Sequence, residues 1–231
     1  MVFNLRDDWM RIYDPDDLNR YQVYGQAVLS GARTKSFVID TVQEERVFGI
    51  QFQPDGTFPF FRLPASEMEN QTIDLLCLWG RAGDELRERL LAAPTIAHMF
   101  LLSEKFLLLQ LVRPLGLHRA VAFAQQQFCR YPHRVSVGSV VADIGMSQRR
   151  FIQLFHEQVG LTKKAFCRVR RFQRILHKVH ETREVDWADV ALTCGYYDQA
   201  HFIHDFRDYS GITRSQYLVR ATEHLNHVPE V

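Results

Sequence analysis

Cysteine is scarce in this sequence, and its spacing gives no sign of a metal site. Four cysteines lie far apart without any CxxC pair: Cys77, Cys129, Cys167 and Cys194. Structural zinc sites and disulfide frameworks need closely paired or clustered cysteines, so we expect neither. We also expect no bound metal and no cofactor.

Long apolar runs and a secretory start are missing as well. The longest apolar stretch, residues 99–112, contains Glu104 and Lys105 and is too short to span a bilayer. The first eight residues lack an apolar segment behind a basic start. We therefore expect a cytoplasmic protein with reduced thiols and no membrane association.

Charge is uneven along the chain, although it nearly cancels overall. Residues 1–116 contain 12 Lys and Arg against 16 Asp and Glu, whereas residues 117–220 contain 16 against 9. The net charge is therefore −4 in the first part and +7 in the second. The last eleven residues add two glutamates, which gives the total of +1. This split is typical of a sensor or partner module joined to a polyanion-binding module. Uneven surface charge without any partner is the alternative.

The first half mixes strand and helix patterns. Alternating apolar residues predict strands at residues 2–5, 36–41 and 47–53, and residues 54–56 predict a turn. A short helix is expected to start at residues 64–67, with further helices at residues 84–91 and 95–112 and a linker at residues 113–116. We expect an α+β domain, a small antiparallel sheet plus helices, over residues 1–113.

The second half shows helical periodicity throughout. The predicted helices span residues 117–129, 136–144, 147–158, 163–180, 187–194, 198–209 and 214–219. The longest has an apolar stripe at three- and four-residue spacing, formed by Phe166, Val169, Phe172, Leu176 and Val179. Its opposite face carries Arg168, Arg171, Arg174 and Lys178. This pattern predicts an all-α domain over residues 117–220.

One pattern occurs twice in the last third. Ile144-Gly145-Met146 is followed by Phe151, Phe155, Gly160 and Thr162, and Cys194-Gly195-Tyr196 is followed by Phe202, Phe206, Gly211 and Thr213. A helix, a glycine turn and a second helix make a helix-turn-helix, whose second helix lies in the DNA major groove. We therefore predict two such units, at residues 136–158 and 186–210, joined by the long helix.

Each predicted second helix has an apolar face and a polar face. The first should pack Phe151, Leu154 and Phe155 and expose Gln148, Arg149, Arg150 and Gln153. The second should pack Phe202, Ile203 and Phe206 and expose Gln199, Ala200, His204 and Arg207. Arg and Gln side chains match guanine and adenine edges. Either helix alone is better explained as an amphipathic surface helix, but the repetition favours DNA binding.

Residues 136–180 and 187–218 together resemble the DNA-binding domain of AraC-type transcription regulators. The spacing agrees, because Gly145 and Phe155 are ten positions apart while Gly195 and Phe206 are eleven apart. The resemblance implies base contacts by Arg149, Gln153, Gln199 and His204. It places Gln148, Lys163, Lys164 and Arg214 at the phosphate backbone, and we add Arg150 and Arg207 to that set. For each, a solvated surface side chain is the alternative.

Several residues depart from the family pattern. Lys163 and Arg214 replace the proline that often begins a helix there. Tyr197 stands where a small capping residue is usual, so the following helix is expected to lack that side-chain acceptor. Val141 replaces a common alanine. We expect these changes to lower stability and alter the tilt of the second helix without abolishing binding.

Residues 47–90 resemble a domain of uncharacterised role that precedes such a DNA-binding unit in one AraC-type subgroup. Relatives usually carry strands before the segment that resembles residues 2–5. Either the start of this chain is misassigned or the module is shortened, and in the second case its sheet should leave an edge uncovered.

These observations predict a sequence-specific transcription regulator, an activator or repressor that reads two adjacent major-groove segments. Double-stranded DNA is the expected partner, RNA polymerase is a candidate partner, and the sequence identifies no effector. An interaction protein that modulates another regulator without binding DNA is one alternative. An enzyme tethered to DNA is disfavoured, because Cys77 and His98 are the only residues of their types before residue 116. We interpret Cys77 as a core residue beside Leu75, Leu76 and Leu78.

The helix at residues 95–112 carries more leucine than one buried face requires: Leu101, Leu102, Leu107, Leu108, Leu109 and Leu111. A homodimer seam could use the surplus. Burial inside its own domain is the slightly favoured alternative.

Overall fold

The computed structural model describes residues 1–40, 45–54, 56–131, 135–181, 185–196, 198–220 and 222. The chain divides into two compact units. The first comprises Met1–Arg33, Phe37–His118 and Leu154–Leu161, and the second comprises Thr34–Ser36, Arg119–Gln153 and Thr162–Val231. Asp55 in the expected turn and Thr41 at the end of an expected strand lie outside the described residues.

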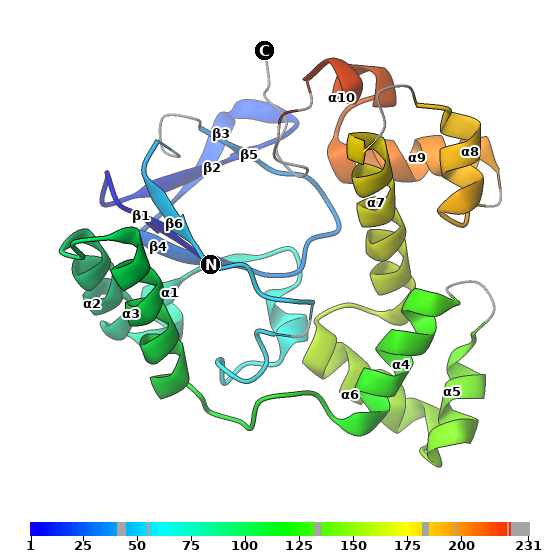
Figure 1. The fold of residues 1–231 in the computed structure, drawn as a ribbon, viewed down its shortest axis with the longest axis horizontal. Helices are drawn as coiled ribbons and strands as arrows, with labels where there is room; N and C mark the ends of the chain where they lie inside the picture. The colour runs from blue at the N-terminus through cyan, green and yellow to red at the C-terminus, as the bar shows by residue number, and fades with distance from the viewer. Residues whose placement is uncertain are drawn as a thin grey trace. The chain divides into compact units, whose positions relative to one another are not determined.

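Two antiparallel sheets form the first unit (Figure 1). In the four-stranded sheet the order is β6 (Val47–Gly49), β1 (Val2–Asn4), β4 (Ala27–Ser30) and β7 (Thr72–Asp74). The order in the three-stranded sheet is β3 (Asp17–Tyr24), β2 (Met10–Asp14) and β5 (Val38–Ile39). The strands β1, β5 and β6 lie within predicted ranges, whereas the sequence patterns missed the other four.

Strand β1 lies inside its sheet. It pairs with β4 on one side, where Val2 faces Val28, and with β6 on the other, where Phe3 faces Phe48. The Phe3 side chain is fully buried in the core. Strands from later in the chain therefore flank β1 on both sides, and β6 and β7 form the edges of this sheet.

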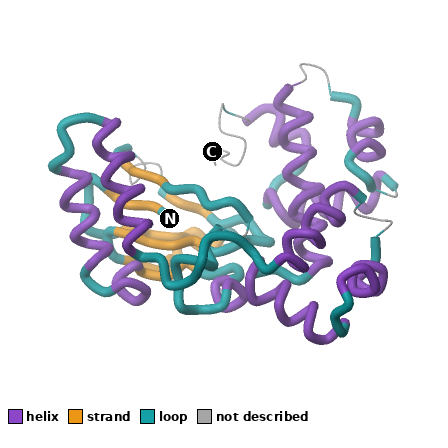
Figure 2. Tube along the Cα trace, turned by 60° about the horizontal axis from the view of Figure 1, so that its bottom comes forward, coloured by secondary structure: helices purple, strands orange, loops and turns teal. Residues whose placement is uncertain are grey.

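Three helices cover one face of the four-stranded sheet (Figures 1 and 2): α1 (Leu75–Trp79), α2 (Ala82–Leu91) and α3 (Ile96–Leu109). A short 3₁₀ helix, η2 (Ala65–Met68), precedes them. Their shared core with the sheet includes Phe3, Leu29, Phe61, Leu86, Leu90 and Phe106. The buried Arg87 on α2 donates to the Asn4 carbonyl at 2.5 Å and the Asp7 carbonyl at 3.0 Å, so it fixes the chain after β1.

Two expectations about side chains in this unit are wrong. Cys77 is exposed on α1, since the five-residue helix turns Leu75 rather than Cys77 into the core. The leucine surplus of α3 is only partly absorbed by its own unit, because Leu101, Leu108 and Leu109 are exposed. Within the described residues, even α3 and the 19-residue α7 fall short of what a bilayer-spanning helix requires.

The second unit is helical, as predicted. Its helices are α4 (Arg119–Arg130), α5 (Val137–Ile144), α6 (Gln148–Val159), α7 (Lys163–Glu181), α8 (Trp187–Thr193), α9 (Gln199–Ser210) and α10 (Arg214–Arg220), with the end of α6 assigned to the first unit. The predicted stripe of α7 faces the core, where Phe172, Leu176 and Val179 pack with residues of α8 and α9. The fold class expected from the sequence is confirmed.

Candidate nucleic-acid interface

The duplicated sequence pattern is also a duplicated backbone pattern. The four glycines of the two helix-turn-helix repeats all have positive φ angles: 64° at Gly145, 81° at Gly160, 84° at Gly195 and 73° at Gly211. Such angles strain residues with a Cβ atom, so glycine is required at these turns. The turns close alike, because the Met146 amide donates to the Val141 carbonyl and the Tyr196 amide to the Ala191 carbonyl.

The helices that follow the two helix-turn-helix repeats, α7 and α10, begin with equivalent caps. Thr162 Oγ1 accepts from the Ala165 amide at 3.2 Å before α7, and Thr213 Oγ1 accepts from the Gln216 amide at 3.3 Å before α10. Lys163 and Arg214, which replace the usual proline, hold equivalent positions just after these caps. Each lies over an aromatic ring: Lys163 Nζ is 5.2 Å from the ring centre of Phe128, and Arg214 Cζ is 5.8 Å from that of Trp187.

Both candidate recognition helices have a side-chain cap. Ser147 Oγ accepts from the Arg150 amide at 3.3 Å at the start of α6, and Asp198 Oδ1 accepts from the His201 amide at 2.7 Å at the start of α9. The expectation that α9 lacks a side-chain acceptor at its start is therefore wrong, because Asp198, one position after Tyr197, supplies that acceptor. Tyr197 itself lies outside the described residues.

Helix α6 has the two-sided character expected of it. Phe151, Leu154 and Phe155 are buried. The side chains predicted for the groove are exposed: Gln148, Arg149, Arg150 and Gln153. This face therefore offers two amide and two guanidinium groups to a ligand, while three apolar side chains anchor the helix.

Helix α9 presents a comparable face. Phe202 and Phe206 are buried, and Gln199, Ala200, His204 and Arg207 are exposed. One expectation is wrong, because Ile203 is 44% exposed and lies on the open side of the helix. Asp205 is buried in its place with only 2% exposure. The apolar pattern could not reveal this, since a buried aspartate depends on partners elsewhere in the chain.

Two arginines of α7 are hydrogen-bonded to Asp205. Arg168 donates to Asp205 Oδ1 through Nε at 3.1 Å and through Nη2 at 2.6 Å, and Arg171 Nη2 lies 3.5 Å from Oδ2. These hydrogen bonds raise the pKa of Arg168 above its ordinary value. Arg171 is itself buried. These two cations, expected on an open basic face of the long helix, instead tie α7 to α9.

A third cation of that helix face is paired too, because Lys178 Nζ lies 2.6 Å from Asp189 Oδ2 on α8. Arg174 donates to the Cys129 carbonyl. The basic face predicted for the long helix is thus largely engaged within the unit. Cations for an external polyanion come mainly from α6 and from the helix starts.

An open cavity of 580 Å³ lies between α7 and α9, lined by Lys163, Lys164, Cys167, Arg168, Arg171, His201, His204, Asp205 and Asp208. Burial raises the pKa of the Cys167 thiol there, so this thiol is a weak nucleophile. His201, Asp205 and Asp208 were not predicted as site residues. Two aspartates that each follow a histidine by four positions were the signal, because such pairs share one helix face.

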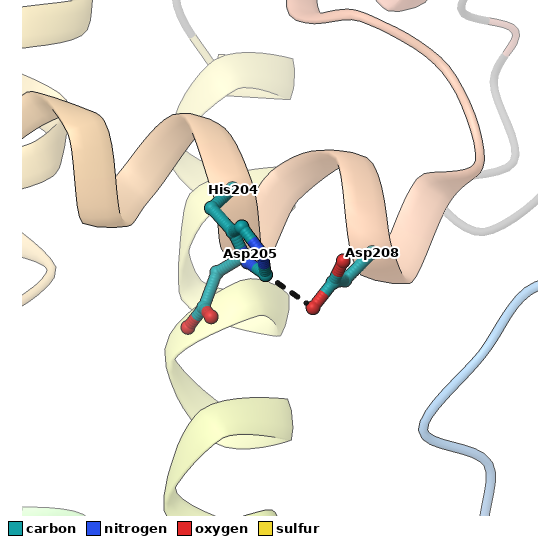
Figure 3. A group of neighbouring side chains, drawn as sticks. All are labelled: His204, Asp205 and Asp208. Atoms are coloured by element: carbon teal, nitrogen blue, oxygen red, sulfur yellow. Dashed lines mark ion pairs between the residues drawn. The ribbon is translucent and has the colours of Figure 1, made fainter.

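Three of these side chains have metal-ligand chemistry. His204, Asp205 and Asp208 bring ligand atoms within 4.8 Å of one another, the one such group found among the described residues (Figure 3). Arg168 contacts both carboxylates, at 2.6 Å from Asp205 and 3.0 Å from Asp208. Because the guanidinium already neutralises these oxygens, the group is better explained as an ion-pair network than as a cation site.

Comparison with known protein families also identifies a helix-turn-helix domain in this part of the chain. A helix-turn-helix domain model of the AraC type matches residues 140–220, from the second half of α5 to the end of α10. The chain carries an AraC-type helix-turn-helix domain. This domain supports a role as a DNA-binding transcription regulator. A domain of unknown function, DUF6597, matches residues 1–74 ahead of the AraC-type domain. Curated protein sequences give no match.

Solved structures include similar proteins. Apo ToxT from Vibrio cholerae is 12% identical, with 96% of this chain and 89% of that chain covered and a TM-score of 0.51, which shows a shared fold. The C-terminal domain of AraT, a response regulator from Geobacillus stearothermophilus, is 19% identical over 47% of this chain and 94% of its own, with a TM-score of 0.41. A DNA-binding transcriptional dual regulator from Escherichia coli K-12 is 22% identical over 45% and 94%, with a TM-score of 0.36.

Proposed function

We propose that this regulator reads two adjacent major-groove segments of one duplex, with α6 in one segment and α9 in the other. The observation that carries the proposal is the repeated exposure of polar side chains on α6 and α9 in front of buried phenylalanines. A recognition helix needs both faces, one to pack and one to meet base edges. The 19 residues of α7 give a spacer of about 28 Å, near the roughly 34 Å of one DNA turn.

We assign base contacts to Arg149 and Gln153 on α6 and to Gln199 and His204 on α9. Their exposure supports this assignment. An arginine can donate two hydrogen bonds to guanine, and a glutamine can donate and accept at adenine. Substituting these residues is expected to change sequence preference as well as affinity.

Phosphate contacts are assigned to a second set: Gln148, Arg150, Lys163, Lys164, Arg207 and Arg214. Such contacts fix the position of a protein on DNA without reading sequence. Lys163 and Arg214 are well suited, because each begins a helix directly behind a glycine turn and a threonine cap. Their equivalent places in the two units predict equivalent contacts on two stretches of backbone.

Residues 1–113 are proposed to form a sensor or dimerisation domain and residues 117–220 the DNA-binding domain. The exposed stripe of α3 supports dimerisation, since Ile96, Phe100, Leu101, Leu108 and Leu109 are all exposed. A second copy is the occupant we favour, because Glu104 and Lys105 lie between two apolar patches and could pair reciprocally. RNA polymerase is a further proposed partner of the DNA-bound regulator.

The direct test is footprinting with the full chain on duplexes from the region flanking its own gene. We expect a protected stretch that weakens as salt rises, because phosphate contacts release counterions. Absent or salt-insensitive binding would contradict the proposal.

Unchanged regulation in cells by a protein with Arg149→Glu and Arg150→Glu would favour the alternative of an interaction protein that does not bind DNA. Catalysis by the N-terminal unit would need a reactive Cys77, which thiol titration would detect.

A further inference from the structure

One proposed base-contacting residue has a carboxylate beside one of its two ring nitrogens. His204 Nδ1 lies 3.2 Å from Asp208 Oδ2, one helical turn further along α9 (Figure 3). The His204 side chain is 72% exposed, so the rest of the ring is accessible. The two nitrogens of an imidazole point in different directions, and the contact at Nδ1 therefore leaves Nε2 for a ligand.

The Asp208 carboxylate does not act alone. Its Oδ2 accepts a hydrogen bond from Arg168 Nη2 at 3.0 Å, and the same Nη2 donates to Asp205 Oδ1 at 2.6 Å. Asp205 is almost completely buried. A chain of contacts thus runs from a buried carboxylate through a fixed guanidinium to the carboxylate that faces His204. This chain restricts where the Asp208 oxygen can lie relative to α9.

A carboxylate oxygen in that position decides which nitrogen carries the proton of a neutral imidazole. A proton on Nδ1 faces the oxygen favourably, whereas a lone pair on Nδ1 would face oxygen lone pairs and be repelled. The Nδ1–H tautomer is therefore favoured. In that tautomer Nε2 has a lone pair and is a hydrogen-bond acceptor.

We propose that Asp208 is a positioning residue that holds His204 in the Nδ1–H tautomer, so that Nε2 accepts a hydrogen bond from an exocyclic amino group in the major groove. The amino groups available there are N6 of adenine and N4 of cytosine. Guanine and thymine offer acceptors at O6, N7 and O4, which a lone pair would repel. The inference rests on the proposed DNA-reading role of α9 and adds to it a base class for one position.

The first measurement concerns the tautomer and needs no DNA. Long-range ¹H–¹⁵N spectra of the full chain distinguish the two neutral imidazole tautomers at alkaline pH, where imidazoles are neutral, and His204→Ala identifies the signal. We expect Nδ1–H in the wild type and a mixture of tautomers in Asp208→Ala. A wild-type spectrum with the proton on Nε2, or an unchanged spectrum in Asp208→Ala, would overturn the inference.

The second measurement concerns base preference. Preferred binding sites are first selected from randomised duplexes with the wild type and with His204→Ala. The position at which His204→Ala loses its preference is then occupied by each of the four base pairs in turn, and the affinity for each duplex is measured. For the wild type we expect roughly 5- to 10-fold tighter binding to the two pairs that place adenine or cytosine on the strand facing His204 than to the two that place guanine or thymine there, as for one added hydrogen bond. Asp208→Ala should reduce this ratio to about 2-fold, and the double variant with His204→Ala should match His204→Ala alone.

Asp189→Ala is the matched control, because Asp189 is also an exposed aspartate paired with a cation of α7. It should leave the ratio unchanged even if overall affinity falls. Equal losses of affinity for all four pairs in Asp208→Ala would show a purely structural role and overturn the inference. Failure of the wild type to select any sequence would instead count against the proposed function, and the tautomer spectrum would still decide the role of Asp208.

Discussion

Asp205 is the residue on which the attachment of α9 to α7 depends most. Its buried carboxylate faces the Arg168 and Arg171 guanidinium groups, and Arg171 is only 8% exposed. A charge taken out of water is tolerated when an opposite charge and hydrogen bonds compensate for its lost hydration. The opposite charges of Asp205, Arg168 and Arg171 therefore hold the candidate recognition helix on α7. Removing one of these charges leaves a buried charge without a partner.

Asp205→Asn tests this compensation. The substitution keeps the shape of the side chain but leaves the buried Arg171 without a counter-charge, so the free energy of unfolding should fall by about 3–5 kcal/mol. Urea unfolding followed by circular dichroism measures the change. Asp189→Asn, in an exposed pair with Lys178, should lower it by less than about 1 kcal/mol. Equal effects of the two substitutions would contradict the role given to Asp205.

Arg149 and Lys164 provide a contrast between reading and positioning. Arg149→Ala should cost about 1–3 kcal/mol at the preferred site and relax preference at one base pair. Lys164→Ala should weaken binding to all sequences alike and reduce the salt slope by about 1. Titrations on the selected and scrambled duplexes at several salt concentrations separate these outcomes. A uniform loss for Arg149→Ala would remove it from the base-contacting set.

Helices were predictable from this sequence to a far greater extent than strands. The helices of the second unit carry full apolar stripes, glycine turns and caps, all of which are local signals. Strand β3 is exposed along most of its length, so no alternation of apolar residues marks it, and the three residues of β7 are too few for a pattern. The bond from Arg168 to Asp205 joins positions 37 apart, which no single-helix pattern can reveal.

Helix α3 is the element whose exposed face requires a partner most clearly. Leu101 and Leu108 are seven positions apart and lie on one face of the helix, with Glu104 and Lys105 on its two flanks. In a parallel pair, Glu104 of each copy would lie beside Lys105 of the other. An antiparallel pair would bring like charges together, so the order of these residues favours the parallel arrangement.

Charge exchange on α3 tests this arrangement. Glu104→Lys should weaken the dimer, because it sets lysine against lysine at the centre, and Lys105→Glu should do the same with glutamates. The double exchange restores opposite charges and should restore the dimer. Sedimentation velocity of the full chain measures the association, and Leu109→Asp is the variant that should abolish it. A monomeric wild type at micromolar concentration would contradict the dimer proposal.

Over the whole molecule, the charge available to DNA is smaller than the composition indicates. The C-terminal part carries +7, yet Arg168, Arg171 and Lys178 are paired with aspartates of α8 and α9. The proposed interface keeps a smaller group of cations: Arg149, Arg150, Lys163, Lys164, Arg207 and Arg214. Affinity for DNA should accordingly depend on a few placed charges rather than on overall charge.

The salt dependence of binding measures this number. With counterions released by the five cations assigned to phosphates, Arg150, Lys163, Lys164, Arg207 and Arg214, a plot of log affinity against log salt concentration should have a slope of about −4.5. A slope near −14, as if all 16 Lys and Arg of residues 117–220 took part, would show that the internal pairs open on DNA. The same titrations should give a footprint of roughly 20 base pairs per chain, two turns of duplex.

The inner position of β1 has a consequence for how the protein is made. Residues 2–4 leave the ribosome before their neighbours in β4 and β6, which follow up to residue 49, and Arg87, which donates to the Asn4 carbonyl, comes later still. The apolar strand must therefore wait unpaired during synthesis of the segment that completes it. Ribosome-bound fragments that stop short of α2 should remain sensitive to protease, while those extending past it should become resistant.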